Sequence, residues 1–171
     1  MKAKAIVFEA PHSLSVRELE LAPMGPRDLE ITVAVSGIST GTERLLWEGS
    51  MPPFPGLSYP LVPGYETVGT IAKMGAEVTG WAVGDSVFLP GSYAFQGVQN
   101  IFGGSGERLV VPHERAVKLD PALGAKGVLL ALAATAYHAV SGGGQQEPFT
   151  PPDLIIGHGV MGRLLARIKS G

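Results

Sequence analysis

Hydrophobic and polar residues alternate along several short segments of this sequence. The first three of these segments are residues 3–9, 14–21 and 29–35. Because successive side chains of a strand point to opposite faces, alternation with a period of two indicates strands that bury one face. Four later segments are further strand candidates: residues 67–72, 86–89, 108–111 and 116–119. The pattern therefore predicts a domain built mainly from short strands.

Two segments carry a helical pattern instead. Residues 40–47 predict a short helix, with Thr40 or Thr42 capping its start and Gly49 marking its end. Residues 126–140 form a longer apolar segment that ends before three consecutive glycines, as a helix commonly does. We expect this second helix to join the β domain to the C-terminal segment of the chain.

Two stretches between the predicted strands show neither pattern. Residues 51–64 contain five prolines, and residues 90–106 are rich in glycine and aromatic side chains. Both are predicted to be irregular surface loops. The 24 glycines and 14 prolines imply frequent tight turns, which are typical of a β-barrel or a β-sandwich.

Composition and charge narrow the functional classes. The 171 residues are 45% hydrophobic and 16% charged, so the chain can bury a sizeable core. The net charge is −2 and the 13 Lys and Arg residues are scattered, which argues against nucleic acid and favours a small-molecule partner. The sequence has no uninterrupted apolar run of 18 residues and no signal-peptide pattern. We expect a cytoplasmic protein with no transmembrane segment.

One glycine-rich motif has the surroundings of a nucleotide site. The spacing G-x-G-x-x-G occurs at Gly157, Gly159 and Gly162. It comes after residues 153–156, which we predict to be a buried strand, and it precedes an amphipathic helical pattern. In dinucleotide-binding folds the three glycines allow a tight turn, close approach of a pyrophosphate, and packing of helix on strand. The phosphates would lie at the helix N-terminus, here Val160 and Met161. An ordinary glycine-rich turn is the alternative.

The chain ends at Gly171, soon after this motif. The acidic residue that holds the adenosine ribose in such folds stands about 20 residues beyond the glycines. We therefore expect that this polypeptide by itself neither completes a nucleotide-binding sheet nor turns over a substrate.

The segment Gly64-Tyr65-Glu66-Thr67-Val68-Gly69, followed by Gly75, Val78 and Gly84-Asp85-Ser86-Val87, resembles the signature of the medium-chain dehydrogenase/reductase superfamily. The resemblance implies a mainly β, GroES-like (chaperonin-10-like) partial barrel at residues 1–125, followed by a linker helix and loop at 126–150. Residues 151–171 would be the first βα unit of a Rossmann domain that binds NAD, with NADP as an alternative. Members of the superfamily commonly dimerise, so a homodimer is expected for the full-length protein.

The resemblance also bears on zinc. In zinc-dependent members a ligand histidine stands where this sequence has Tyr65, and a ligand cysteine stands near Ser39. Of those ligands Glu66 remains. A catalytic zinc needs three protein ligands, and the sequence has no cysteine at all. We therefore expect no zinc.

Longer segments are similar to one branch of the superfamily: residues 36–43, 47–56, 59–66, 130–136 and 156–167. That branch oxidises the 3-(1-hydroxyethyl) group of a chlorin-type tetrapyrrole to acetyl in bacteriochlorophyll synthesis. The resemblance implies NAD-linked oxidation of a secondary alcohol. Two alternatives stay open: a zinc-independent quinone or enone reductase of the same superfamily, and a non-catalytic GroES-like module that only binds a ligand or partner.

Oxidation of an alcohol without zinc requires a side chain that takes the hydroxyl proton. Tyr65 is the first candidate, because the resemblance puts it at the position of a metal ligand that faces the nicotinamide. Ser39 and Thr40 would relay the proton, and Glu66 would orient a neighbour or shift its pKa. Each has a structural alternative: a packing aromatic for Tyr65, helix caps for the hydroxyls, and an ion-pair partner for Glu66.

A flat macrocycle needs a wide cleft with apolar walls. The wall candidates are aromatic residues in or beside the two long loops: Trp47, Phe54, Tyr59, Tyr93, Phe95 and Phe102. Each of them would alternatively anchor its own loop. Thr135 lies in the linker helix, where the superfamily places residues beside the nicotinamide; otherwise its hydroxyl would bond back to the preceding turn.

Overall fold

The computed structural model describes residues 1–144, 150 and 152–169. By its internal contacts the chain forms two compact units, Met1–Val128 and Leu129–Gly171. The expected linker at 126–150 and the expected Rossmann segment at 151–171 each include residues that lie outside the described ones.

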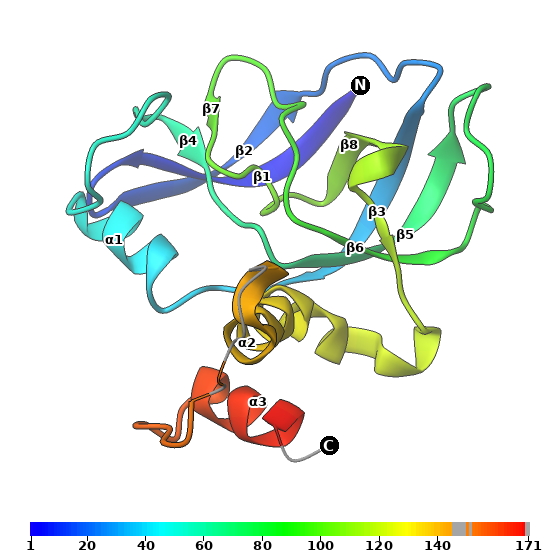
Figure 1. Ribbon diagram of the computed structural model, residues 1–171. Coiled ribbons are helices and arrows are strands. Elements are labelled where there is room, and N and C mark those ends of the chain that lie inside the picture. Colours follow the sequence, from blue (N-terminus) through cyan, green and yellow to red (C-terminus); the bar gives the residue numbers. More distant parts are fainter. Residues whose placement is uncertain (145–149, 151, 170–171) are drawn as a thin grey trace. The chain divides into compact units, whose positions relative to one another are not determined.

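The first unit contains a four-stranded sheet. Its strands are β1 (Lys2–Ala10), β2 (Ser13–Glu20), β4 (Leu61–Val62) and β7 (Gln99–Asn100), in the order β2-β1-β4-β7. β1 and β2 form an antiparallel hairpin, the pair of long blue strands in Figure 1. The alternation over residues 3–9 and 14–21 thus predicted both strands correctly.

A five-stranded antiparallel sheet completes the first unit. Its strands are β3 (Asp28–Ser36), β5 (Thr67–Met74), β6 (Ser86–Leu89), β8 (Arg108–Pro112) and β9 (Val117–Lys118), in the order β8-β3-β5-β6-β9. All five coincide with segments that the sequence pattern predicted. The turn before β6 is held by Asp85, which accepts a hydrogen bond from the backbone N–H of Ala82 and forms an ion pair with Lys118 at 2.8 Å.

The main core lies on the inner faces of both sheets. Its fully buried side chains come from alternate positions, such as Val7 of β1, Leu29 and Ile31 of β3, and Leu109 of β8. Burial of such side chains stabilises the fold by about 1.5–3 kcal/mol each before entropy is counted. The period of two in the sequence is therefore the signature of this core.

The two predicted loops are more ordered than the sequence indicates. β4 lies within residues 51–64 and pairs with β1 through Phe8 and Leu61, and β7 lies within residues 90–106 and pairs with β4. A second hydrophobic cluster forms beneath them, made of buried Phe8, Leu46, Leu61 and Ile101. The prediction of purely irregular surface loops was wrong there, because a two-residue strand is too short to show alternation.

The short helix α1 (Thr42–Glu48), drawn in cyan in Figure 1, lies beside the turn of the β1–β2 hairpin, where the backbone N–H of His12 donates to the carbonyl of Trp47. Gly49 ends it in the left-handed conformation, with φ of 69°, as predicted. The predicted cap was wrong: neither Thr40 nor Thr42 caps the helix, and Gly41 is the N-cap residue. Instead Ser39 Oγ accepts hydrogen bonds from the backbone N–H groups of Gly41 and Thr42, each at 3.2 Å.

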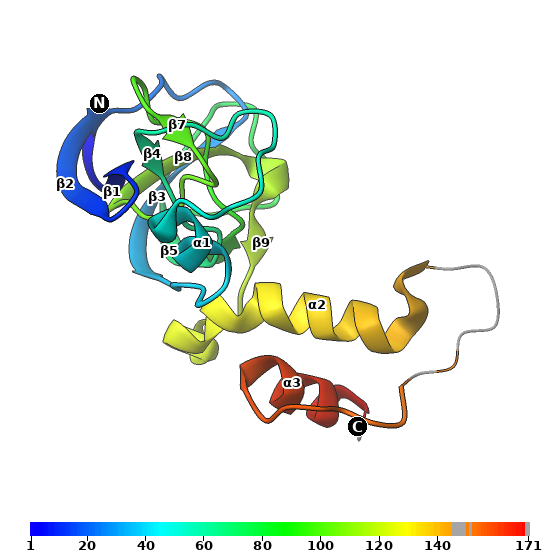
Figure 2. The ribbon, with the colours of Figure 1, turned by 90° about the vertical axis from the view of Figure 1, so that its left-hand side faces the viewer.

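Helices account for the rest of the described secondary structure. The 3₁₀ segments are His113–Arg115, Pro121–Leu129 and Gly142–Gly144, and the α-helices are α2 (Leu130–Ser141) and α3 (Val160–Lys169). Within the second unit, α2 and α3 run side by side, in yellow and red in Figure 2. Gly142 ends α2 with φ of 75°, as the run of three glycines predicted.

The buried strand expected at residues 153–156 does not form. These residues are irregular, and Leu154 and Ile156 are 75% and 91% exposed. A strand must pair its backbone N–H and C=O groups with a neighbour, and no described residue pairs with this segment. That expectation is therefore corrected, although the next helix begins close to where the pattern places it.

One helix in the described part of the chain is long and apolar enough to cross a membrane, judged by length and composition alone. It covers Pro121–Ser141, with a mean hydropathy of 1.4 and 11% of its apolar window buried. Helices in the cores of soluble proteins and signal sequences have the same length and composition, so a single such helix is weak evidence. The expectation of no transmembrane segment stays a prediction.

Candidate active site

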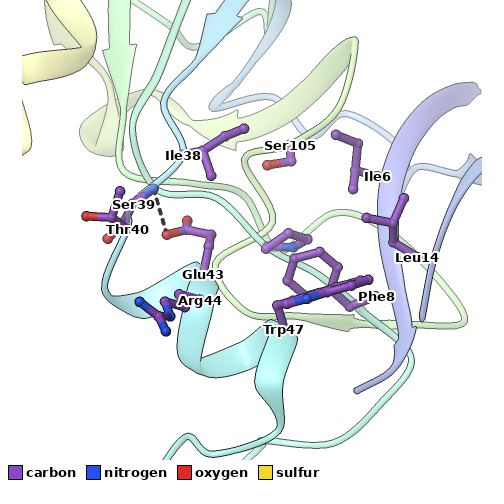
Figure 3. A pocket seen from close by; sticks show the side chains of 11 residues that line it. Ile6, Phe8, Leu14, Ile38, Ser39, Thr40, Glu43, Arg44, Trp47 and Ser105 are labelled. Carbon is purple, nitrogen blue, oxygen red and sulfur yellow. Dashed lines mark hydrogen bonds between the residues drawn. The ribbon is translucent and has the colours of Figure 1, made fainter. Parts of the chain in front are cut away.

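A cavity of about 450 Å³ opens in the first unit between the β1–β2 hairpin and α1 (Figure 3). Its lining comes from β1, β2, α1, the segment before α1, and two loop positions. The residues are Ile6, Phe8, Leu14, Ile38, Ser39, Thr40, Glu43, Arg44, Trp47, Pro63 and Ser105. The volume falls within the range of small-molecule sites, and most of the lining is apolar.

The apolar wall and the polar end of this cavity come from different elements. Phe8 of β1 and Trp47 of α1 meet edge to face with ring centroids 5.9 Å apart, and they line the apolar part. Ser39, Thr40 and Glu43 gather at the other end, as Figure 3 shows. A ligand would therefore meet hydrocarbon along most of its length and hydroxyl and carboxylate groups at one end.

Glu43, in the first turn of α1, is fixed by the segment that precedes the helix. Its side chain is 6% exposed, and its Oε2 accepts a hydrogen bond from the backbone N–H of Ser39 at 3.0 Å. Burial raises the pKa of the Glu43 carboxyl, and the nearby Glu66 carboxylate raises it further. Hydrogen bonds from the backbone of Glu43 and of Ser39 act in the opposite direction. Glu43 is thus a buried acid whose ionised form is disfavoured.

Glu66 is a second buried carboxylate, 5% exposed, in the segment before β5. No described residue donates a hydrogen bond to its Oε1, and burial raises the pKa of its carboxyl. Its Oε2 lies against Gly37, where an added Cβ would come within 2.4 Å of that oxygen. The expected structural alternative, an ion pair for Glu66, is absent among the described residues.

Replacing Gly37 with alanine should lower the free energy of unfolding by about 1–3 kcal/mol, the usual cost of overpacking. The new Cβ would lie 2.4 Å from Glu66 Oε2 and 2.9 Å from Glu66 Cβ, so the carboxylate would have to move. Denaturant unfolding measures the loss. Gly41→Ala is the matched control, because a Cβ there would be 3.7 Å from Ser39 Oγ, an ordinary contact. Equal stability of the two variants would contradict this packing.

Tyr65 lies near the helix start but is not among the residues that line the cavity. Its hydroxyl donates a long hydrogen bond to Thr42 Oγ1 at 3.5 Å, and its ring packs edge to face on Phe102 with centroids 5.2 Å apart. Ser39 and Thr40 do line the cavity, and Thr40 is exposed. Of the four catalytic candidates, the structure thus brings Ser39 and Thr40 to the cavity and places Tyr65 and Glu66 outside its lining.

The six aromatic wall candidates fall into separate places. Trp47 lines the large cavity, whereas Phe54, Tyr93 and Phe102 line a second one of about 320 Å³. The Tyr59 hydroxyl donates to the backbone carbonyl of Leu46, which anchors its loop. Phe95 is 3% exposed and belongs to the main core. The expectation that Phe95 forms part of the substrate cleft is therefore corrected, because a ring enclosed by the core is not available to a substrate.

The glycine motif of the second unit forms a tight turn into α3. Gly157 has φ of +110°, a conformation that L side chains rarely adopt. A Cβ on Gly162 would lie 2.3 Å from the carbonyl oxygen of Gly157, so only glycine fits there. A Cβ on Gly159 would meet no atom of the described residues within 4 Å. α3 begins at Val160, and Met161 lies in its first turn, as the motif predicts.

Thr135 and the possible metal ligands are the remaining predicted positions. The Thr135 hydroxyl donates to the backbone carbonyl of Ala131 at 3.0 Å, the back-bonding that was the alternative to a cofactor contact. Among the described residues no group of three or more His, Cys, Asp or Glu side chains could hold a metal ion. Glu43 and Glu66 alone do not fit the three-ligand requirement of a catalytic zinc.

The sequence pattern did not indicate Glu43. This residue stands one helical turn before Trp47, on the helix that the pattern did predict, so its place at the polar end of the cavity results from α1 packing against β1. An acidic residue in the first turn of a helix is ordinarily explained by its interaction with the helix dipole. The sequence therefore provides no reason to expect that the Glu43 side chain is buried.

Comparison with known proteins identifies the family to which this fold corresponds. Residues 25–121 match the family model described as the alcohol dehydrogenase GroES-like domain, which confirms the expected fold class. A short-chain alcohol dehydrogenase from Escherichia coli CFT073, solved with the cofactor NADH, superimposes with a TM-score of 0.72. It shares 25% sequence identity, and the match covers 98% of this chain and 52% of that one.

Two curated relatives carry one name, 2-desacetyl-2-hydroxyethyl bacteriochlorophyllide A dehydrogenase. The protein from Rhodobacter capsulatus is 48% identical over 98% of this chain and 52% of its own length. The protein from Cereibacter sphaeroides is 47% identical over 98% of this chain and 53% of its own length. The chain thus spans about half the length of the curated relatives it matches.

Proposed function

The chain belongs to the family of alcohol dehydrogenase GroES-like domains, and on that premise we propose that it is the substrate-binding part of a bacteriochlorophyllide dehydrogenase. The reaction is the oxidation of a hydroxyethyl side chain on a chlorin-type ring to an acetyl group, with a nicotinamide dinucleotide as hydride acceptor. The proposal takes NAD as that acceptor. The names and the coverage of the two bacterial relatives support the assignment.

The observation that carries the proposal is the two-ended cavity beside α1. Its apolar length, between Phe8 and Trp47, suits the edge of a flat hydrocarbon ring. Its polar end, with Ser39 and Glu43, suits a hydroxyl group. A secondary alcohol on an apolar ring presents both of these features in one molecule.

The two units would contribute different parts of the reaction: the second unit would bind the dinucleotide, and the first would bind the alcohol. The glycine turn at Gly157–Gly162 would hold the pyrophosphate of the dinucleotide, with Val160 and Met161 at the helix N-terminus. When bound, the nicotinamide supplies the oxidising equivalent. Glu43 and Glu66 alone do not fit a catalytic zinc, so the proposal assigns binding, orientation and deprotonation of the alcohol to side chains of the first unit.

The test incubates the complete product of the gene that encodes this chain with the hydroxyethyl pigment and NAD, with NADP in a parallel assay. An acetyl group conjugated to the ring shifts the pigment's absorption, and NADH formed in equal amount gives the second readout. Reduction of a quinone or an enone with no pigment oxidation would favour the reductase alternative. Pigment binding without turnover would favour the binding module.

Substituting Ile38 with tryptophan should raise KM for the pigment by about tenfold or more, because an indole would fill part of the cavity. Ile38 is 79% exposed, so the larger ring is compatible with folding, and its side chain points toward the cavity in Figure 3. Ile38→Val at the same position is the control and should keep KM within about twofold. An unchanged KM in the tryptophan variant would remove this cavity as the pigment site.

A further inference from the structure

The buried carboxylates of this protein have two kinds of surroundings, with and without a paired cation. Glu30 of β3 is 3% exposed, and it pairs with Lys73 at 2.9 Å and with Arg108 at 3.1 Å. Glu43 and Glu66 are nearly as buried, yet no ion pair joins either of them to a cation among the described residues. Buried charges are normally paired, so these two carboxylates need another explanation.

Both carboxylates contact the short segment before α1, because Glu43 Oε2 accepts from the Ser39 backbone N–H and Glu66 Oε2 lies against Gly37. The charge of Glu66 disfavours the ionised form of Glu43, and Glu66 Oε1 has no hydrogen-bond donor among the described residues. Two buried carboxylates that interact in this way hold a proton more readily than either would in water. Glu43 lines the cavity, whereas Glu66 is not among the residues that line it.

On this geometry, and resting on the function proposed above, we propose that Glu43 is the group that accepts the hydroxyl proton of the alcohol, with Glu66 as the positioning residue that tunes it. Glu43 Oε2 accepts a hydrogen bond from the Ser39 backbone N–H, and the Glu43 side chain lies at the polar end of the cavity (Figure 3). Tyr65, the first candidate from the sequence, is engaged with Thr42 and Phe102 and does not line this cavity.

The proposed step conserves atoms and electrons. The O–H bond of the substrate breaks and its proton goes to a carboxylate oxygen of Glu43. The electron pair of that bond becomes the second carbon–oxygen bond of the ketone. The C–H bond of the carbinol carbon breaks, and its electron pair leaves with the hydrogen as hydride to the oxidised nicotinamide, which is reduced. Glu43 then returns the proton to solvent through the open mouth of the cavity.

The charged surroundings of Glu43 are few. On α1 its neighbour Arg44 faces the cavity, and the Arg44 guanidinium pairs with Glu48 at 2.8 Å. β1, β2 and the segment at Ser105 contribute uncharged side chains to the lining. The segment before β5 contributes Glu66 and, as a further titratable group, the phenol of Tyr65. Glu66 is therefore the charged group outside α1 that adds to the effect of burial on the proton affinity of Glu43.

The proposed role of Glu43 determines the direction in which kcat changes with pH. Catalysis needs the ionised carboxylate, so kcat should rise as the pH rises through the Glu43 pKa. Removing the Glu66 charge should lower that pKa, which moves the acid limb of the kcat profile toward lower pH. A merely structural Glu66 would change stability and leave the position of the limb alone.

The experiment measures kcat, KM and pigment binding against pH for the complete gene product and its variants. Glu43→Gln should lower kcat by about 10²- to 10⁴-fold, abolish the acid limb, and keep pigment binding by difference absorption within a few-fold. Glu43→Asp should keep the limb with partial activity. Glu77→Gln, at an exposed position outside the cavity lining, is the matched control and should keep kcat within about twofold.

A loss below about tenfold in Glu43→Gln, or an acid limb that persists in it, would overturn the assignment. Should that variant fail to fold, Glu66→Gln decides, because an unmoved acid limb there is equally incompatible with the pair. Wild-type protein that binds the pigment without oxidising it would instead count against the proposed function itself. The two failures are therefore distinguishable.

Discussion

Leu61→Ala is expected to lower the free energy of unfolding by about 2–5 kcal/mol, the usual cost of truncating a fully buried leucine. Leu61 is fully buried in β4 and packs with Phe8, Leu46 and Ile101. Truncation removes its transfer free energy and leaves a cavity among rigid neighbours. Chemical denaturation with matched transition slopes measures the difference.

The same substitution should also weaken substrate binding at the candidate site. Leu46 is the buried anchor of α1, and that helix carries Glu43 and Trp47 into the cavity. Looser packing under α1 should therefore raise KM for the pigment as well as lower stability. Leu123→Ala is the matched control, because Leu123 is 44% exposed and its loss should cost within about 0.5 kcal/mol. A Leu61 variant as stable as that control would show that the cluster does not support the fold.

Gly162→Ala should weaken binding of the nicotinamide cofactor by about 10- to 100-fold, which corresponds to about 1.4–2.8 kcal/mol. The new Cβ would lie 2.3 Å from the carbonyl oxygen of Gly157, and that oxygen belongs to the backbone, so the turn itself would have to open. An opened turn no longer aims the N–H groups at the start of α3 toward the phosphates. Cofactor fluorescence titration of the complete gene product measures Kd.

Two further variants separate the turn from the ligand contact. A Cβ at Gly159 meets no atom within 4 Å in the described part of the chain, so Gly159→Ala should leave stability unchanged and weaken binding only through the approach of the pyrophosphate. Ala166→Ser, at an exposed position of α3, should change neither quantity. If Gly162→Ala binds the cofactor as tightly as Ala166→Ser does, the motif is an ordinary glycine-rich turn.

The sequence predicted the elements that are long enough to repeat a pattern. Strands such as β1 and β3 alternate over several residues, and α1 has a recognisable stop at Gly49. β4 and β7 have two residues each, too few to repeat the pattern. β4 forms because β1 offers an edge on which it can pair, and β7 pairs in turn with β4. The resemblance of the glycine motifs to a known superfamily supplied the fold class that these elements build.

The sequence by itself therefore determined the β character of the first unit, its turns, and the glycine motif, because these depend on neighbouring residues in the chain. The tertiary structure decided which side chains share a site. Phe95 and Trp47 are both aromatic residues beside loops, yet one lies in the core and the other in the cavity. Glu43 and Glu66 lie in separate segments of the chain, and only the packing of α1 against the sheet brings these two carboxylates together where both are largely shielded from water. Burial, which no local pattern records, is what turns an ordinary helix-start acid into the candidate proton acceptor.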